Sequence, residues 1–194
     1  MNFLAHIYLS GDDDPIKIGN FIADSVKGKQ LKSFPEKIQK GIILHRHIDS
    51  FTDSHSIVKT SKERLHKRYH HYDGVIIDIL YDHFLAKNWA EYHHTPLKKY
   101  VNDFYSLINN NFDLLPDKTK YMMPYMISNN WLYNYRTIEG IESVLIGMNK
   151  RTKNKSQMHL AVNDLVKHYD DFNNDFTEFF ENLRIFSQEK INDL

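Results

Sequence analysis

Apolar residues recur along most of the chain at intervals of three and four positions, which places their side chains on one face of an α-helix. Asp14-Pro15 is typical of a helix start and is followed by an apolar stripe through Ile16 and Ile22. Further helices are expected from Ser33-Phe34-Pro35-Glu36 and from Thr95-Pro96, and over 56–71, 75–86, 137–148 and about 157–190. Pro116 and Pro124 are expected to bracket a short aromatic-rich connection.

The composition supports a single all-α domain over residues 1–194. Apolar residues make up 41% of the chain, enough for a packed core, and seven Gly and five Pro are too few for many short strands. Cysteine is absent, which excludes disulfides, thiolate metal sites and a cysteine nucleophile. No segment resembles a signal peptide or a membrane span, so we expect a cytoplasmic protein without a membrane partner.

Charge is balanced overall but uneven along the chain. Residues 27–71 contain eleven Lys or Arg side chains and four acidic ones, a net of +7. This segment is either a solvated helix face or a surface that attracts an acidic partner. No interleaved aromatic pattern or recognition helix accompanies it, so we do not expect nucleic acid as the partner.

Two carboxylates interrupt the most apolar predicted helix. Asp78 and Asp82 are four residues apart and therefore project from the same side. Surrounded by Ile, Leu and Phe, they would repel each other unless a cation or another partner compensates them. A divalent metal ion is the simplest compensation, and the alternative is that both side chains face water.

The same spacing relates an imidazole and a carboxylate, His45 and Asp49. Asp24 and His6 are further polar residues in apolar surroundings. Each alone is more typical of a structural residue, but together they indicate a metal site. Imidazole and carboxylate ligands suit Mn²⁺, Fe or Zn²⁺. No HExxH, P-loop, GxGxxG or GxSxG motif is present.

Six short motifs follow one another over roughly the first 151 residues. They are Met1-Asn2-Phe3-Leu4-Ala5-His6, Gly19-Asn20-Phe21-Ile22-Ala23-Asp24, His45-Arg46-His47-Ile48-Asp49 with Thr52-Asp53, Asp82-His83-Phe84-Leu85, Trp131-Leu132 with Tyr135-Arg136, and Gly147-Met148 with Arg151. In order and spacing this series resembles the acyl carrier protein phosphodiesterase family.

The resemblance implies an enzyme that hydrolyses the phosphodiester between 4′-phosphopantetheine and a serine of holo-acyl carrier protein, leaving the apo-carrier. It also implies a divalent cation, typically Mn²⁺, and a single helical bundle like that of the HD-type metal phosphohydrolases. The HD signature is an adjacent His-Asp pair, whereas this chain has Asp82-His83 in reverse order and His45 separated from Asp49. Metal ligands therefore cannot be transferred from that superfamily position by position.

Residue roles follow from combining the spacing with the resemblance. The metal is expected to be held by some of Asp24, His45, Asp49, Asp78 and Asp82. The candidates for the general acid that protonates the serine leaving group are His6 and His83. Asn20, Arg46 and Arg136 are assigned to substrate binding, and the basic segment is expected to face the acidic carrier protein.

Two alternative functions stay open at this point. One is an HD-like phosphohydrolase that acts on a nucleotide or another small phosphodiester, which would not require the +7 segment. The other is a non-catalytic helical module that binds an acidic partner, in which the His and Asp residues are structural.

Overall fold

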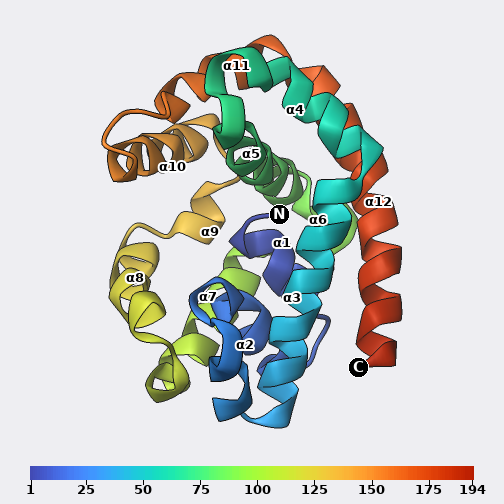
Figure 1. Cartoon of the computed structure of the whole chain (residues 1–194), viewed down its shortest axis with the longest axis vertical. Coiled ribbons are helices and arrows are strands. Elements are labelled where there is room, and N and C mark those ends of the chain that lie inside the picture. Colours follow the sequence, from blue (N-terminus) through green and yellow to red (C-terminus); the bar gives the residue numbers. More distant parts are fainter.

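A computed structural model describes all residues, 1–194, and consists of helices and their connections without any strand (Figure 1). The predicted all-α class is thereby confirmed. The α-helices are α1 (Phe3–Tyr8), α2 (Asp14–Ile22), α3 (Glu36–Ser54), α4 (Ser56–Tyr69), α5 (Asp73–Lys87), α6 (Trp89–Tyr92), α7 (Leu97–Asn110), α8 (Asp117–Ser128), α9 (Trp131–Asn134), α10 (Ile138–Arg151), α11 (Ala161–Lys167) and α12 (Tyr169–Asp193). Short 3₁₀ segments are η1 (Ala23–Ser25), η2 (Gly28–Ser33), η3 (His70–Tyr72), η4 (Phe112–Leu114) and η5 (Met158–Leu160).

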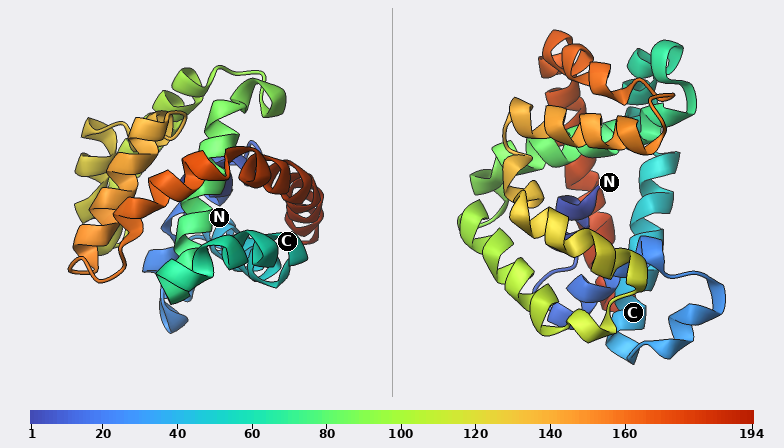
Figure 2. Two further views of the ribbon diagram at one scale, coloured as in Figure 1. Left: turned by 90° about the horizontal axis from the view of Figure 1, so that it is seen from above. Right: turned by 90° about the vertical axis from the view of Figure 1, so that its left-hand side faces the viewer.

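Helix α5 forms the centre of the molecule, and α1, α4, α10 and α12 all contact it (Figures 1 and 2). Ten of its residues are buried, so it is apolar on every side rather than amphipathic. Its aromatic side chains pack against α12, with the ring centroids of Tyr81 and Phe176 5.7 Å apart and those of Phe84 and Phe176 5.9 Å apart. One contiguous cluster of buried apolar side chains results.

Two glycines bring α2 and α3 unusually close. A Cβ atom on Gly19 would lie 2.1 Å from the carbonyl oxygen of Ile38, and one on Gly41 would lie 2.2 Å from that of Ile16. Only glycine allows the two backbones to approach to this distance. The contact sets the end of α2, with Asn20, directly against His45 on α3.

Two predicted boundaries are wrong. The expected connection between Pro116 and Pro124 is helix α8, in which Pro116 precedes the first residue and Pro124 lies inside the helix. Proline inside a helix removes one backbone hydrogen bond and crowds the preceding turn, but the buried residues Thr119, Met123 and Met126 hold α8 in place. The expected final helix over 157–190 is divided into η5, α11 and α12, with a break at His168.

None of the helices is both long and apolar enough to cross a membrane.

Candidate metal centre

Two helices and one 3₁₀ turn bring imidazole and carboxylate groups together. His6 comes from α1, His45 and Asp49 from successive turns of α3, and Asp24 from η1 directly after α2. One ligand atom each from His6, His45 and Asp49 lies within 4.8 Å of the others. These four residues, predicted separately from the sequence, form one cluster, which we call the His-Asp cluster.

Asp49 lies between the two imidazoles. Its Oδ1 is 3.2 Å from Nε2 of His6, and its Oδ2 is 3.1 Å from Nε2 of His45. Asp24 also approaches Nε2 of His45, with its Oδ1 at 3.3 Å. Both imidazoles are buried, whereas the Asp24 side chain is 68% exposed, so the cluster opens to solvent on the side of Asp24.

Asn20 holds both imidazole rings from behind. Its side-chain oxygen accepts hydrogen bonds from Nδ1 of His6 at 2.8 Å and from Nδ1 of His45 at 3.1 Å. Its amide nitrogen donates to the carbonyl oxygen of His6 and to Oγ of Ser10, both at 2.9 Å, which fixes the orientation of the amide. Both Nδ1 atoms therefore carry hydrogen, and both Nε2 atoms are directed at the carboxylates.

The two rings stack with centroids 4.0 Å apart and planes 19° apart, so two positive charges on them would repel strongly. Burial, and then the neighbouring His45, lower the pKa of His6 to about 4. Burial also disfavours a charge on His45, but Asp24 and Asp49 raise the pKa of that ring to about 9. Burial alone would raise the pKa of Asp49, yet the two imidazoles hold it well below its usual range.

This donor set fits a transition metal ion. The Nε2 lone pair of neutral His6 faces Oδ1 of Asp49 and also the carbonyl oxygen of Met1, which is 3.1 Å away. Three acceptor atoms that face one another are stabilised by a cation between them. Two imidazole nitrogens with one or two carboxylates suit Mn²⁺, Fe or Zn²⁺, and the hydrogen bonds to Asn20 supply the outer support that metal-binding histidines commonly have.

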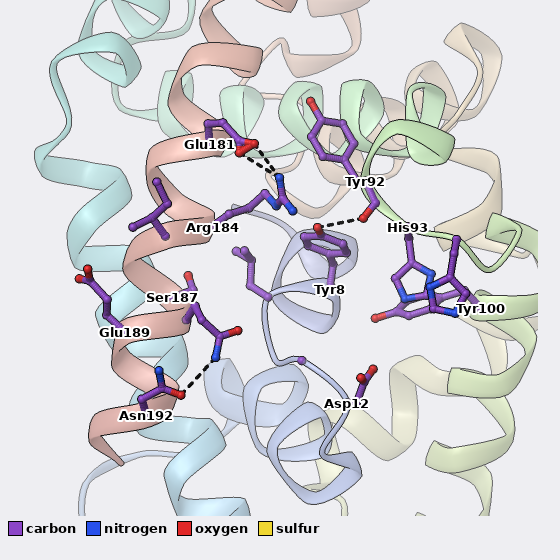
Figure 3. Close-up of a pocket in the computed structure, with 15 residues that line it drawn as sticks. Tyr8, Asp12, Tyr92, His93, Tyr100, Glu181, Arg184, Ser187, Glu189 and Asn192 are labelled. Carbon is purple, nitrogen blue, oxygen red and sulfur yellow. Dashed lines mark hydrogen bonds and ion pairs between the residues drawn. The ribbon is translucent and has the colours of Figure 1, made fainter.

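A small polar cavity lies over the cluster. It has a volume of about 170 Å³ and is lined by Met1, Asp24, His45, Asp49, Thr52, Asp53 and Asp78. A larger cavity, of about 620 Å³, lies elsewhere, between α12 and the aromatic side chains of Tyr8, Tyr92 and Tyr100 (Figure 3). It contains none of the His-Asp cluster residues, and the chemistry therefore points to the smaller cavity.

The two carboxylates of α5 have different positions and different hydrogen-bond partners. Asp78 lines the cavity, and its Oδ1 accepts a hydrogen bond from the buried α-ammonium group of Met1 at 2.9 Å. Asp82 is fully buried and does not line the cavity, and its two oxygens accept the backbone N–H groups of Leu4 at 2.8 Å and Ala5 at 3.2 Å. Burial raises the pKa of Asp82 to about 7. Asp82 therefore caps the N-terminus of α1.

Three other predicted site residues lie outside the cavity wall. Nδ1 of His83 donates to the carbonyl oxygen of Tyr135, and its Nε2 accepts from the hydroxyl of Tyr169, both at 2.8 Å. The guanidinium group of Arg136 stacks on the ring of Tyr133, 3.8 Å from its centroid. Arg46 is exposed on α3, next to His45.

Asn20 was predicted to bind substrate, and in the structure its side chain holds both imidazole rings. The carbonyl group of Met1 was not predicted as part of the site. The Met1 carbonyl carries no sequence signal because it is common to all residues. The position of Asn20, four residues before Asp24, was visible, but its role in holding two rings depends on the close packing of α2 against α3.

Comparison with known proteins gives a consistent result. A model of a family described as acyl carrier protein phosphodiesterase matches residues 1–183. A protein of that name from Enterobacter sp. (strain 638) is 31% identical over 191 residues, 98% of this chain and 99% of its own. Another from Pectobacterium atrosepticum is 30% identical over 184 residues, 94% of this chain and 95% of its own. No solved structure matches the chain.

Proposed function

Because this chain belongs to the acyl carrier protein phosphodiesterase family, we propose that it hydrolyses the phosphodiester that joins 4′-phosphopantetheine to a serine of holo-acyl carrier protein. The products are the apo-carrier and 4′-phosphopantetheine. The observation that carries the proposal is the His-Asp cluster at the base of a polar cavity, because a phosphodiester is stable without strong electrostatic activation.

A divalent metal ion, Mn²⁺ in our proposal, would be held by His6, His45 and Asp49, with Asp24 on the solvent side. When bound, such an ion neutralises charge on the phosphate and lowers the pKa of a bound water from 15.7 towards about 7. This assignment makes His6 a ligand rather than a general acid, because its Nε2 atom faces Asp49.

The chain's own residues prepare the site in three ways. Asn20 holds the Nδ1 hydrogens of both imidazoles, so that both Nε2 atoms face Asp49. Asp49 lies between both rings and balances the charge of His45. Asp24 is the exposed carboxylate, and we assign it to orienting the attacking water and accepting its proton at Oδ1 or Oδ2.

Charge complementarity favours a protein substrate of acidic character. The segment 27–71 has a net charge of +7 and leads into the cluster through α3. Oppositely charged surfaces steer association, and exposed charges are screened over about 10 Å at 0.1 M salt. We therefore expect KM for the carrier to rise when salt is increased from 50 to 500 mM, and a flat response would contradict electrostatic docking.

The decisive experiment incubates holo-carrier with the protein and Mn²⁺ and follows loss of the prosthetic arm by mass spectrometry. We expect conversion to the apo-carrier, loss of activity in excess EDTA and recovery with Mn²⁺. Titration of the metal-free protein with Mn²⁺ by calorimetry should give stoichiometric binding that His45→Ala abolishes. Cleavage of nucleotide or small diesters with no action on holo-carrier would contradict the proposed substrate, and undiminished activity in EDTA would contradict the metal.

A further inference from the structure

Helix α8 presents an unusual outward face. Tyr121 is 74% exposed and Tyr125 is 51% exposed, and their rings lie 5.6 Å apart. Lys118, Tyr121 and Tyr125 are spaced i, i+3 and i+7 and therefore share one side of the helix, which we call the α8 tyrosine face. Eight large apolar side chains are exposed on the molecule, and four of them fall between residues 112 and 125. These four are Tyr121 and Tyr125 on α8 and Phe112 and Leu114 just before it.

Helix α8 adjoins the candidate metal centre through its inner side, and the α8 tyrosine face is on the outer side of the same helix. Thr119, on the inner side of α8, donates its hydroxyl to Oγ of Ser25 at 3.1 Å. Ser25 directly follows Asp24, the exposed carboxylate of the His-Asp cluster. The right-hand view of Figure 2 shows α8, in yellow, running beside the blue segment that follows α2.

Positive charge surrounds the same place. The 3₁₀ segment η2 follows η1 after two residues and contributes Lys29 and Lys32, and Lys27 lies between them and the cluster. These three lysines and Lys118 are all exposed, and none forms an ion pair within the chain. Unpaired cations on η2 and on α8, together with the exposed aromatic rings of α8, favour a partner that has both acidic and apolar groups.

We propose that the α8 tyrosine face and the lysines of η2 form the surface on which the carrier protein docks. This rests on the proposed function, whose chemistry limits where the carrier sits. The scissile bond is at the carrier's serine, at the near end of the prosthetic arm, so the carrier's own surface must lie against the mouth of the cavity. Tyr121 and Tyr125 then pack on apolar side chains of the carrier, while the lysines face its acidic groups.

The test compares a double variant, Tyr121→Ser with Tyr125→Ser, with a matched control, Val166→Ser with Ile185→Ser. Val166 and Ile185 are each 60% exposed, but they lie on α11 and α12. We expect the tyrosine variant to raise KM for holo-carrier at least about tenfold with kcat nearly unchanged, because aromatic anchors dominate interface energies. The control variant should change KM less than about twofold, as contacts outside an interface contribute little.

A binding measurement separates this inference from the proposed function. Holo-carrier is titrated into the inactive His45→Ala protein, with and without the two tyrosine substitutions, and Lys118→Glu provides an independent change on the same face. Weaker binding of both substituted proteins supports the docking surface even if the wild type were found not to hydrolyse the carrier. Unchanged binding and KM, or no binding of the carrier at all, would overturn it.

Discussion

Helices α3 and α5 each carry two polar groups four residues apart, and the structure uses them in opposite ways. On α3, His45 and Asp49 face His6 and Asp24, so that acceptor atoms converge on one place. On α5, the oxygens of Asp78 and Asp82 face N–H donors, the ammonium group of Met1 and the backbone amides of Leu4 and Ala5. The spacing is the same, and only the neighbours differ.

The spacing of two residues on a helix fixes where their side chains lie but not what they bind. Helical spacing decides that two side chains share a face, but the donors or acceptors on the opposite element decide whether a cation is needed there. The α5 carboxylates accept hydrogen bonds from Met1, which precedes α1, and from Leu4 and Ala5 of α1. The α3 pair receives none from α2, because Asn20 supplies only acceptor oxygen to the imidazoles.

The largest expected effect is on the α3 side. Asp49→Asn keeps the shape of the side chain but removes the charge that faces both imidazoles. We expect Mn²⁺ affinity and kcat/KM to fall by more than about 100-fold, because removal of a ligand costs more than the loss of its outer support. Calorimetric titration and steady-state kinetics measure both quantities. Asp103→Asn, the same change at an exposed ion pair on α7, should leave Mn²⁺ affinity and kcat/KM unchanged. Equal losses in the two variants would contradict a specific role of Asp49 in metal binding.

The second effect concerns folding rather than chemistry. Asp82→Ala leaves two buried backbone N–H groups without an acceptor and should lower the free energy of unfolding by about 2–4 kcal/mol. Asp82→Asn retains one acceptor and should cost less, and it provides a folded protein if the alanine variant fails to fold. Urea denaturation gives the stability, and Mn²⁺ titration of the folded variant should give nearly wild-type affinity. A folded, stable Asp82→Asn protein that no longer binds Mn²⁺ would instead place Asp82 in the metal site.

A smaller effect is expected at Asn20, which supports the α3 side without belonging to the proposed ligand set. Asn20→Ala removes the oxygen that orients both rings, and we expect Mn²⁺ affinity to fall about 10- to 100-fold, the usual cost of losing such support. Asn20→Asp keeps the acceptor and should recover part of the affinity. Wild-type affinity in the alanine variant would show that the rings are held by packing alone.

The smallest effect is a pH dependence at His83, on the α5 side. Burial lowers the pKa of His83 below the 6.5 of the unfolded chain, so the unfolded state binds the proton more readily. The stability of the wild type relative to His83→Gln should therefore decline as pH falls below 6.5, by at most about 1.4 kcal/mol per pH unit. Urea denaturation of both proteins between pH 7.5 and 5 measures the difference. A kcat lowered 100-fold or more in a stable His83→Gln protein would restore His83 as the general acid.

Much of this site could be predicted from the sequence because helical spacing determines which side chains share a face. His45 and Asp49 are four residues apart in a segment predicted to be helical, and Asp24 follows the apolar stripe of another predicted helix. The helix from Pro35 and the apolar helix over 75–86 appear as α3 and α5 with small changes at their ends.

Helical spacing does not show which groups lie opposite a given helix face. Asp78 and Asp82 have the composition expected of metal ligands, and nothing within their own helix indicates that the first five residues of the chain supply donors to them. The helix across Pro124 was missed for a related reason, since α8 is stabilised by buried side chains such as Met123 and Met126 that contact the rest of the molecule.

The paired glycines of α2 and α3 have a practical consequence for engineering. Replacing a mid-helix glycine by alanine is a common route to higher thermal stability, with gains of about 0.4–1 kcal/mol where the backbone permits it. At Gly19 or Gly41 the added methyl group would collide with a carbonyl oxygen and push apart the helices that carry Asn20 and His45. The two glycines thus fix the distance between Asn20 and His45, although neither has a reactive side chain. Both should be left unchanged when the protein is engineered for thermal stability.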